Sequence, residues 1–153
     1  MRVLVLSDIH GNLVALNAVL KAAKEIGYDT VYCLGDLVGY GPNPDECVTK
    51  IRELPTETCV MGNHDAAVSG YISIESFNQD AQHSVHWGID HVSPGNLQYL
   101  NHLPDLLVQD GCTIVHGSPR NPIWEYILDS YTARMNYEFF ETQFCFIGHS
   151  HQP

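Results

Sequence analysis

The stretch VLVLSDIH, Val3–His10, changes abruptly from four apolar residues to polar ones. A run of this kind, without alternation of apolar and polar residues, is typical of a strand that is covered on both faces in an α/β sheet. The same pattern recurs in four further segments, so the sequence predicts five strands. These are Val3–His10, Thr30–Asp36, Glu57–Asp65, Cys112–Gly117 and Phe144–His151.

Two helices are predicted between the first three runs. Apolar residues recur at helical spacing between Asn12, a good N-cap, and Gly27, which can end a helix. A shorter helix is expected within Asn43–Pro55, with Pro44 in its first turn. Such βαβ units have right-handed crossovers, which make their strands parallel neighbours.

The segment from Ala66 to Pro104 has a different pattern. Residues 73–88 and 93–103 have the composition of two helices, the second with Ser93 as its cap and Pro94 at its first position. Neither contains a further strand, so we expect residues 66–104 to be a helical insertion over one side of the sheet.

Each predicted strand ends at residues that bind divalent cations well. The carboxyl ends of strands in an open parallel sheet are where ligands bind, so these side chains are expected to converge on one edge of one sheet. Asp8 and His10, two positions apart in an extended segment, would point the same way, as would His149 and His151. The candidate set is Asp8, His10, Asp36, Asn63, His116, His149 and His151.

Each of these signals is weak when taken alone. A DxH triplet occurs by chance, a lone histidine is more often structural than a ligand, and GNHD (Gly62–Asp65) also suits a simple turn. Packing does not readily explain all of them together, each at the end of a strand. Because no cysteine belongs to the set, the pattern disfavours a structural zinc site and favours one that holds water and phosphate.

Composition limits the possible functions. A length of 153 residues suits a single domain, which we expect to span residues 1–153. The net charge of −11 disfavours nucleic-acid binding but allows an anionic substrate if bound cations reverse the local charge. Five cysteines without CxxC spacing suggest small buried residues in a reducing compartment. With no apolar run long enough for a signal peptide or a membrane span, we expect a cytoplasmic protein.

The ordered motifs resemble those of the calcineurin-like metallophosphoesterase superfamily, and in particular its small bacterial and archaeal phosphodiesterase-like members. The motifs are SDIHGN (7–12), LGDLVGYGP (34–42), MGNHD (61–65), VHGSP (115–119) and IGHSHQP (147–153). The resemblance implies a β-sandwich flanked by helices (α-β-β-α). Family members normally continue beyond the last GHxH, so we expect a C-terminally truncated domain that lacks strands of the second sheet.

The resemblance also implies a dinuclear metal site. Asp36 would bridge two divalent ions, and a metal-bridging hydroxide would attack a phosphomonoester or phosphodiester bond. Oxygen and imidazole ligands suit manganese, iron, cobalt, nickel or zinc. The first ion would be held by Asp8, His10, Asp36 and His151, and the second by Asp36, Asn63, His116 and His149.

Further roles follow from the same motifs. His64 would stabilise charge on the phosphoryl oxygens or protonate the leaving alkoxide, with its tautomer held by Asp65. Arg120 is a candidate for binding the substrate phosphate and, alternatively, an ordinary surface residue. Asn12 is a candidate substrate contact and, alternatively, only a helix cap. Asn63 is a candidate for substrate binding as well as for metal ligation.

Other functions remain open at this point. A scaffold of the same fold that binds metal without turnover is one alternative, although such relatives usually lose ligands. A phosphoprotein phosphatase and a dinucleoside polyphosphate hydrolase are further alternatives. The expected partner is a small phosphoester or nucleotide, with no nucleic acid and no membrane, and the sequence does not specify an oligomeric state.

Overall fold

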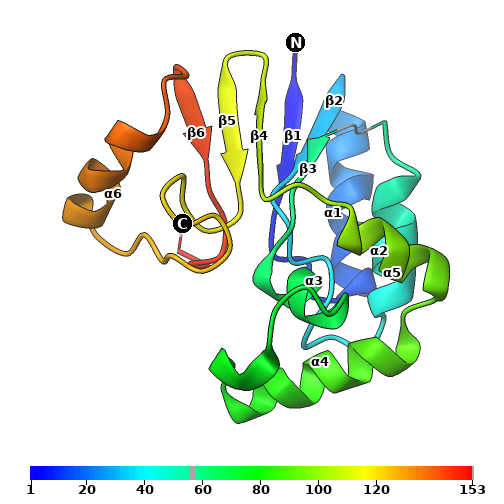
Figure 1. The fold of residues 1–153 in the computed structure, drawn as a ribbon. Coiled ribbons are helices and arrows are strands. Elements are labelled where there is room, and N and C mark those ends of the chain that lie inside the picture. Colours follow the sequence, from blue (N-terminus) through cyan, green and yellow to red (C-terminus); the bar gives the residue numbers. More distant parts are fainter. Residues whose placement is uncertain (56–57, 153) are drawn as a thin grey trace.

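Two three-stranded sheets form the centre of the protein, whose computed structural model describes residues 1–55 and 58–152. The first sheet has the order β1-β2-β3 with all strands parallel, and the second has the order β4-β5-β6. In the second sheet β4 is antiparallel to β5, and β6 is parallel to β5 (Figure 1). The strands are β1 (Val3–Leu6), β2 (Thr30–Cys33), β3 (Thr58–Cys59), β4 (Leu106–Gln109), β5 (Cys112–Val115) and β6 (Phe144–Phe146).

The helices between the strands of the first sheet begin and end close to the predicted signals. Helix α1 (Leu13–Ile26) begins after Asn12, whose side chain accepts a hydrogen bond from the Ala15 N–H, and ends at Gly27, where φ is 81°. Helix α2 (Pro44–Arg52) has its proline at the first position. Both predicted helices and the parallel pairing of their strands are therefore confirmed.

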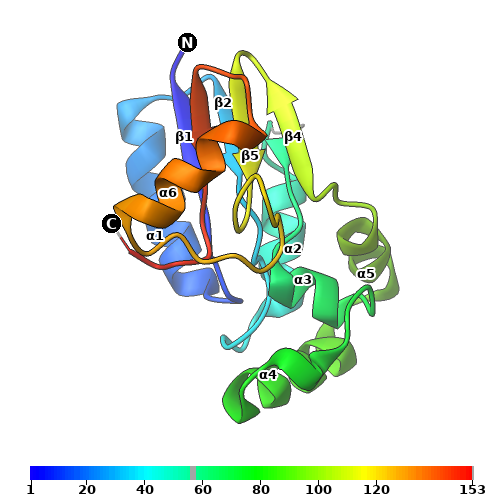
Figure 2. The ribbon, with the colours of Figure 1, turned by 60° about the vertical axis from the view of Figure 1, so that its left-hand side comes forward.

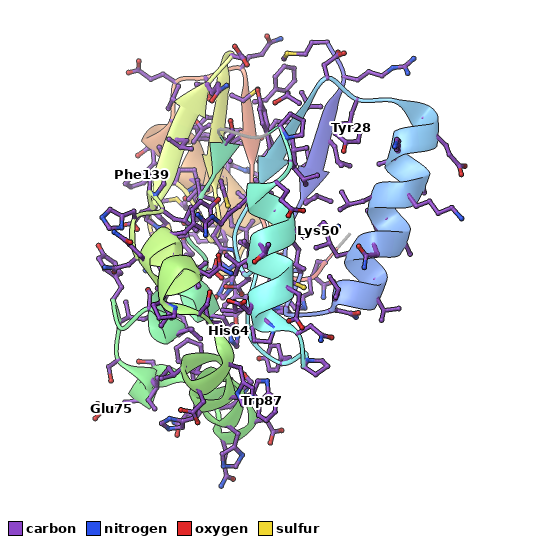
Figure 3. The ribbon with its side chains drawn as sticks, turned by 90° about the vertical axis from the view of Figure 1, so that its right-hand side faces the viewer. Tyr28, Lys50, His64, Glu75, Trp87 and Phe139 are labelled. Carbon is purple, nitrogen blue, oxygen red and sulfur yellow. The ribbon has the colours of Figure 1, made fainter. Side chains whose placement is uncertain are left out.

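The two helices predicted for the helical insertion between Ala66 and Pro104 are present as α4 (Gln79–His91) and α5 (Pro94–Asn101), preceded by the 3₁₀ turn η1 (Ile74–Ser76). A further helix, α3 (Asn63–Val68), was not predicted and begins inside the third predicted strand, of which only β3 is a strand. Ser93 occupies the N-cap position of α5, but its side chain makes no capping hydrogen bond; instead its backbone N–H donates to Asp45 Oδ1 at 2.7 Å. Glu75 and Trp87 lie at the outer end of this insertion (Figure 3). Among the described residues, no helix has the length and apolar character needed to cross a membrane.

The expectation that the ligands lie on the edge of one sheet is wrong, because β5 and β6 belong to a second sheet. The sequence prediction also missed β4, which pairs with β5 through a tight turn at Asp110 and Gly111, both with positive φ. The start of the third predicted strand, Glu57, lies outside the described residues, as does Pro153.

Apolar side chains pack on both faces of the first sheet, as its unbroken apolar runs predict. On one face Val31 and Cys33 of β2 join a buried cluster that includes residues of α1 and α2. On the other face Tyr32 packs in a second cluster with Ile114 of β5, and its ring meets that of Phe146 edge-on at 6.2 Å. All five cysteines are free, and three of them are buried.

Helix α6 (Ser130–Asn136) and the turn η2 (Tyr137–Phe139) connect β5 to β6 and lie outside the second sheet (Figure 2). The layers are therefore helices, sheet, sheet and helix, which confirms the predicted α-β-β-α sandwich class. The strands β1 and β5 point in the same direction (Figure 1), so the loops at their carboxyl ends meet on one side of the molecule.

Candidate metal centre

The seven predicted ligands converge at this meeting of loops. The structure shows groups of histidine and aspartate ligand atoms that lie within 4.8 Å of one another and could hold metal ions. Two of these groups draw all their members from the predicted set. They are Asp8, His10 and His151, and Asp36, His116 and His149. The two histidines of the last motif therefore belong to different groups.

The first group is formed by the loops after β1 and β6. His151 Nε2 lies 3.1 Å from Asp8 Oδ1 and 3.2 Å from His10 Nε2, and His10 Nε2 lies 3.9 Å from Asp8 Oδ1. Ligands that share one ion through bonds of about 2.0–2.2 Å are separated by roughly 3.0–3.5 Å. The three atoms are thus spaced nearly as they would be around one ion.

The second group is buried more deeply. His116 Nε2 lies 3.1 Å from Asn63 Oδ1, 3.2 Å from His149 Nδ1 and 3.4 Å from Asp36 Oδ2. His116 is completely buried, and Asn63, His149 and Asp36 are each at most 5% exposed. The arrangement agrees with the expected second set.

Asp36 connects the two groups through one oxygen. Its Oδ2 lies 3.7 Å from His10 Nε2 and 3.4 Å from His116 Nε2. Its Oδ1 instead accepts a hydrogen bond from the His64 backbone N–H at 2.9 Å. This close approach requires Gly62, since a Cβ there would lie 2.1 Å from Asp36 Oδ1. Asp8 is held in the same way, because its Oδ2 accepts from the His149 N–H and Oδ1 faces the histidines.

The histidine tautomers test whether these residues suit a metal ion. Imidazole Nδ1 of His10 lies 3.0 Å from the Val38 carbonyl oxygen, and that of His116 lies 2.7 Å from the Leu34 carbonyl oxygen. A carbonyl only accepts, so each Nδ1 carries the proton, and the neutral ring then presents an Nε2 lone pair to the cluster. When both rings are neutral, lone pairs and carboxylate oxygens converge without a donor between them. This set of atoms fits divalent cations.

Without an ion, the electrostatics of the cluster show that the buried Asp36 carboxylate draws positive charge to it, here a proton on His116. Burial by itself would lower the pKa of His116, but the Asp36 carboxylate outweighs it and raises this pKa to about 9. Burial would raise the pKa of Asp36, yet His116, His64 and His10 together hold it well below its usual range. For His149, burial and the neighbouring His116 lower the pKa to about 4. The buried carboxylate thus needs positive charge nearby.

The backbone of the site is strained. Among the described residues, seven that are not glycine have positive φ, and only Asp110 of these lies outside this region. The prediction that the DxH and HxH segments are extended is therefore wrong, since their ligands lie in left-handed turns. The other six are Asp8, His10, Asp36, Tyr40, His149 and His151.

His64, labelled in Figure 3, is buried and lies beside the cluster. Its ring contacts those of His10, Tyr40 and Phe77, with centroids 4.7–5.1 Å apart. One of its nitrogens is within 4.8 Å of ligand atoms of His10 and Asp36. Burial is the main cause that lowers the pKa of His64 to about 4. Its Nδ1 is buried and has no partner among the described residues.

The sequence predicted that Asp65 holds the His64 ring, but in the structure Asp65 bonds to backbone groups instead. Its two carboxylate oxygens accept four backbone hydrogen bonds, which use all four acceptor positions. Burial, together with the Asp36 carboxylate, raises the pKa of Asp65 to about 7. Its role is to fix the loop that contains Asp36. The donors are the N–H groups of Asp36, Leu37, Val38 and Gly62, at 2.8–3.2 Å.

The two candidate substrate residues outside the cluster differ in position. The guanidinium of Arg120 pairs with Glu125, and the structure does not bring it to the ligand cluster. Asn12 lines a cavity of about 540 Å³ beside Asp8 and His10, while its Oδ1 accepts the capping hydrogen bond of α1 from the Ala15 N–H at 3.0 Å.

Sequence reasoning missed Tyr126, whose ring stacks on His149 with centroids 3.8 Å apart. The aromatic residues around it gave no spacing signal.

Comparison with known proteins identifies the family. A sequence model described as calcineurin-like phosphoesterase matches residues 1–153. The chain belongs to this family. Among solved structures of the family's fold, a metallophosphoesterase from Sphaerobacter thermophilus superposes with a TM-score of 0.89 and 46% identity, over 100% of this chain and 62% of that one. The resemblance stated from the motifs is confirmed.

Two further proteins are similar to this chain. The uncharacterized protein MJ0912 of Methanocaldococcus jannaschii is 41% identical over 97% of this chain and 62% of its own length. The hypothetical protein PH1004 from Pyrococcus horikoshii shares the fold, with a TM-score of 0.79 at 24% identity over 99% of this chain and 70% of that one. The chain spans 62% of the length of the first of these relatives and of the Sphaerobacter protein.

Proposed function

We propose that this protein is a dinuclear, metal-dependent phosphoesterase that hydrolyses phosphomonoester or phosphodiester bonds. The observation that supports this most strongly is the position of Asp36 Oδ2 between His10 Nε2 and His116 Nε2. A single carboxylate oxygen that faces two sets of metal ligands suits a bridge between two ions. Family membership supports the reaction class.

Each residue has a defined task in this proposal. Two divalent ions in such a site supply positive charge for the phosphate and water that is activated near neutral pH. Asp8, His10 and His151 hold one ion, and Asn63, His116 and His149 hold the other, with Asp36 shared. Phosphate that reaches the pair lies within range of His64, whose ring N–H donates a hydrogen bond to a phosphoryl oxygen or to the leaving group.

The test combines metal analysis with turnover. Protein purified without chelators should contain close to two transition-metal equivalents and should hydrolyse bis(p-nitrophenyl) phosphate when manganese is added. The Asp36→Asn variant is the control, because it removes charge at the shared ligand with little change in shape. Metal content near zero that does not respond to manganese would contradict the proposal. Two bound ions without turnover would favour the non-catalytic scaffold.

One comparison favours a more specific candidate. A structure titled as a putative diadenosine tetraphosphatase superposes with a TM-score of 0.61 and 27% identity, over 80% of this chain and 53% of that one. Dinucleoside polyphosphates are therefore a second candidate substrate class. A panel of diadenosine tetraphosphate, phosphomonoesters, phosphodiesters and cyclic nucleotides would separate it from general phosphoesterase activity by the ratio of kcat/KM values.

A further inference from the structure

In the described part of the chain, the ligand cluster has no bonded lysine or arginine that could complement the ions. Across residues 1–55 and 58–152, no hydrogen bond or ion pair joins a lysine or arginine to the ligand cluster, and Arg120 is engaged by Glu125. A phosphate held by two ions still presents oxygens away from them. Phosphate sites usually satisfy such oxygens with arginine, lysine, hydroxyl or backbone N–H donors.

Tyr40 lies at the open side of the first ligand group. Its ring centroid is 4.8 Å from that of His10 and 4.7 Å from that of His64, yet 53% of the residue is exposed. It lines the cavity of about 540 Å³ that also borders Asp8 and His151. Its φ of 52° is unfavourable for a bulky residue and is typical of a functional position. The neighbouring Gly41 N–H fixes the loop by donating to the His10 carbonyl at 2.8 Å.

Tyr126 lies over the second ligand group. One face of its ring stacks on His149, while half of the residue remains exposed. The preceding Glu125 is anchored, because its carboxylate accepts hydrogen bonds from Ser118 Oγ and Asn136 Nδ2 and pairs with Arg120. The aromatic ring is therefore held in place by a network that does not itself reach the ligands.

Both tyrosine rings contact ligand histidines, Tyr40 the ring of His10 and Tyr126 the ring of His149. Partial burial raises the pKa of Tyr40, with the Tyr126 phenol and the Asp36 carboxylate as further causes. Burial likewise raises the pKa of Tyr126, followed by the carboxylates of Asp36 and Asp8. Neither hydroxyl has a hydrogen-bond partner among the described side chains and backbone.

We propose that the Tyr40 and Tyr126 hydroxyls form a two-sided clamp that donates hydrogen bonds to the phosphoryl oxygens of the substrate, in the place where other phosphate sites use arginine. The proposal rests on the proposed function, since it requires a phosphate on the ion pair. It assigns to the loops at residues 39–41 and 124–126 the task of binding the phosphoryl group rather than the leaving group. Both hydroxyls are free to donate, and their rings are held by ligand or His64 contacts.

The test removes only the hydroxyls. Tyr40→Phe and Tyr126→Phe keep the ring contacts, so the fold and the ligands should be undisturbed. Titration calorimetry of manganese-loaded protein with inorganic phosphate should give a dissociation constant about tenfold weaker for each variant, because each loses a hydrogen bond to a charged oxygen. Tyr71→Phe is the matched control, since Tyr71 is 55% exposed but lies outside the site, and should bind phosphate as the wild type does.

The outcomes separate the clamp from the proposed function. Weaker phosphate binding in both variants, with bound manganese unchanged, supports the clamp. Wild-type affinity in both variants, or metal-loaded wild-type protein that does not bind phosphate, overturns it. In either case hydrolysis of bis(p-nitrophenyl) phosphate by the wild type still tests the proposed function independently. A wild-type protein that binds no metal refutes both.

Discussion

Replacing Gly39 by alanine should move His64 without disturbing the metal ligands. A Cβ at position 39 would lie 2.3 Å from His64 Nδ1 and 2.7 Å from its Cγ, whereas ordinary contacts begin at 3.4 Å. The ring must therefore retreat by about 1.1 Å. Misplacing a catalytic group by about 1 Å can cost about 100-fold in rate, so kcat/KM for bis(p-nitrophenyl) phosphate should fall about 100-fold. Both ions should stay bound, because His64 is not in the proposed ligand set.

The control for this prediction is Gly70→Ala. Gly70 also has positive φ, 77° against 92° for Gly39, but a Cβ there meets nothing within 4 Å. Both variants share the backbone cost of alanine in the left-handed region, about 1–2 kcal/mol, and only Gly39→Ala adds the clash with His64. Assays should be run well below both melting temperatures, with metal content measured. Equal activity in the two variants, or loss of metal from Gly39→Ala, would refute the role given to His64.

Three further results are expected. Asp36→Asn should lower bound metal to one equivalent or less, as metal analysis can show. It should also lower kcat/KM by at least about 100-fold, because even the loss of a residue that only positions a ligand costs about 10–100-fold. Chelation should lower the melting temperature by about 5–10 °C if the ions stabilise the fold by about 2.7 kcal/mol, as calorimetry can show. The Arg120 hydrogen bond lowers the pKa of Glu125 from 4.5 to about 2, against burial. The stability that Glu125 contributes is therefore fully present above pH 4.5 and is lost as the pH falls towards 2. In urea unfolding, the free energy of unfolding of Glu125→Gln should fall less steeply between pH 4.5 and pH 2 than that of the wild type.

The sequence predicted the parts of the fold that depend on local signals. The caps of α1 at Asn12 and Gly27 and the proline of α2 are set by neighbouring residues, and the structure has them where expected. Unbroken apolar runs correctly indicated strands, and β2 is buried on both faces as predicted, whereas Val5 of β1 and Phe144 of β6 are exposed. Strand β4 was missed because LLVQ (Leu106–Gln109) is a short run without a metal ligand at its end, so it lacked the feature that marked the others.

The site was predictable in its membership but not in its detailed contacts. The motif positions identified the ligands, and the structure brings them together, although their binding of ions stays a prediction. The partners of Asp65 are N–H groups that lie up to 29 residues away in sequence, and no local pattern specifies them. Similarly, Tyr126 reaches His149 because Glu125 is anchored by Ser118 and Asn136, which are contacts that exist only in the folded chain.

The left-handed ligand residues show how the cluster is held before any ion binds. Each such conformation costs of order 1–3 kcal/mol and persists only where the surroundings enforce it. Here the loops enforce one another: the Asp8 N–H donates to the Gly35 carbonyl at 3.1 Å, and the His10 N–H donates to the Asp36 carbonyl at 2.9 Å. These bonds join the loop after β1 to the loop after β2 through the backbone, independently of the side chains that would bind metal. We therefore expect the chelated protein to melt at a lower temperature but still cooperatively, unlike small zinc domains, which unfold when their metal is removed.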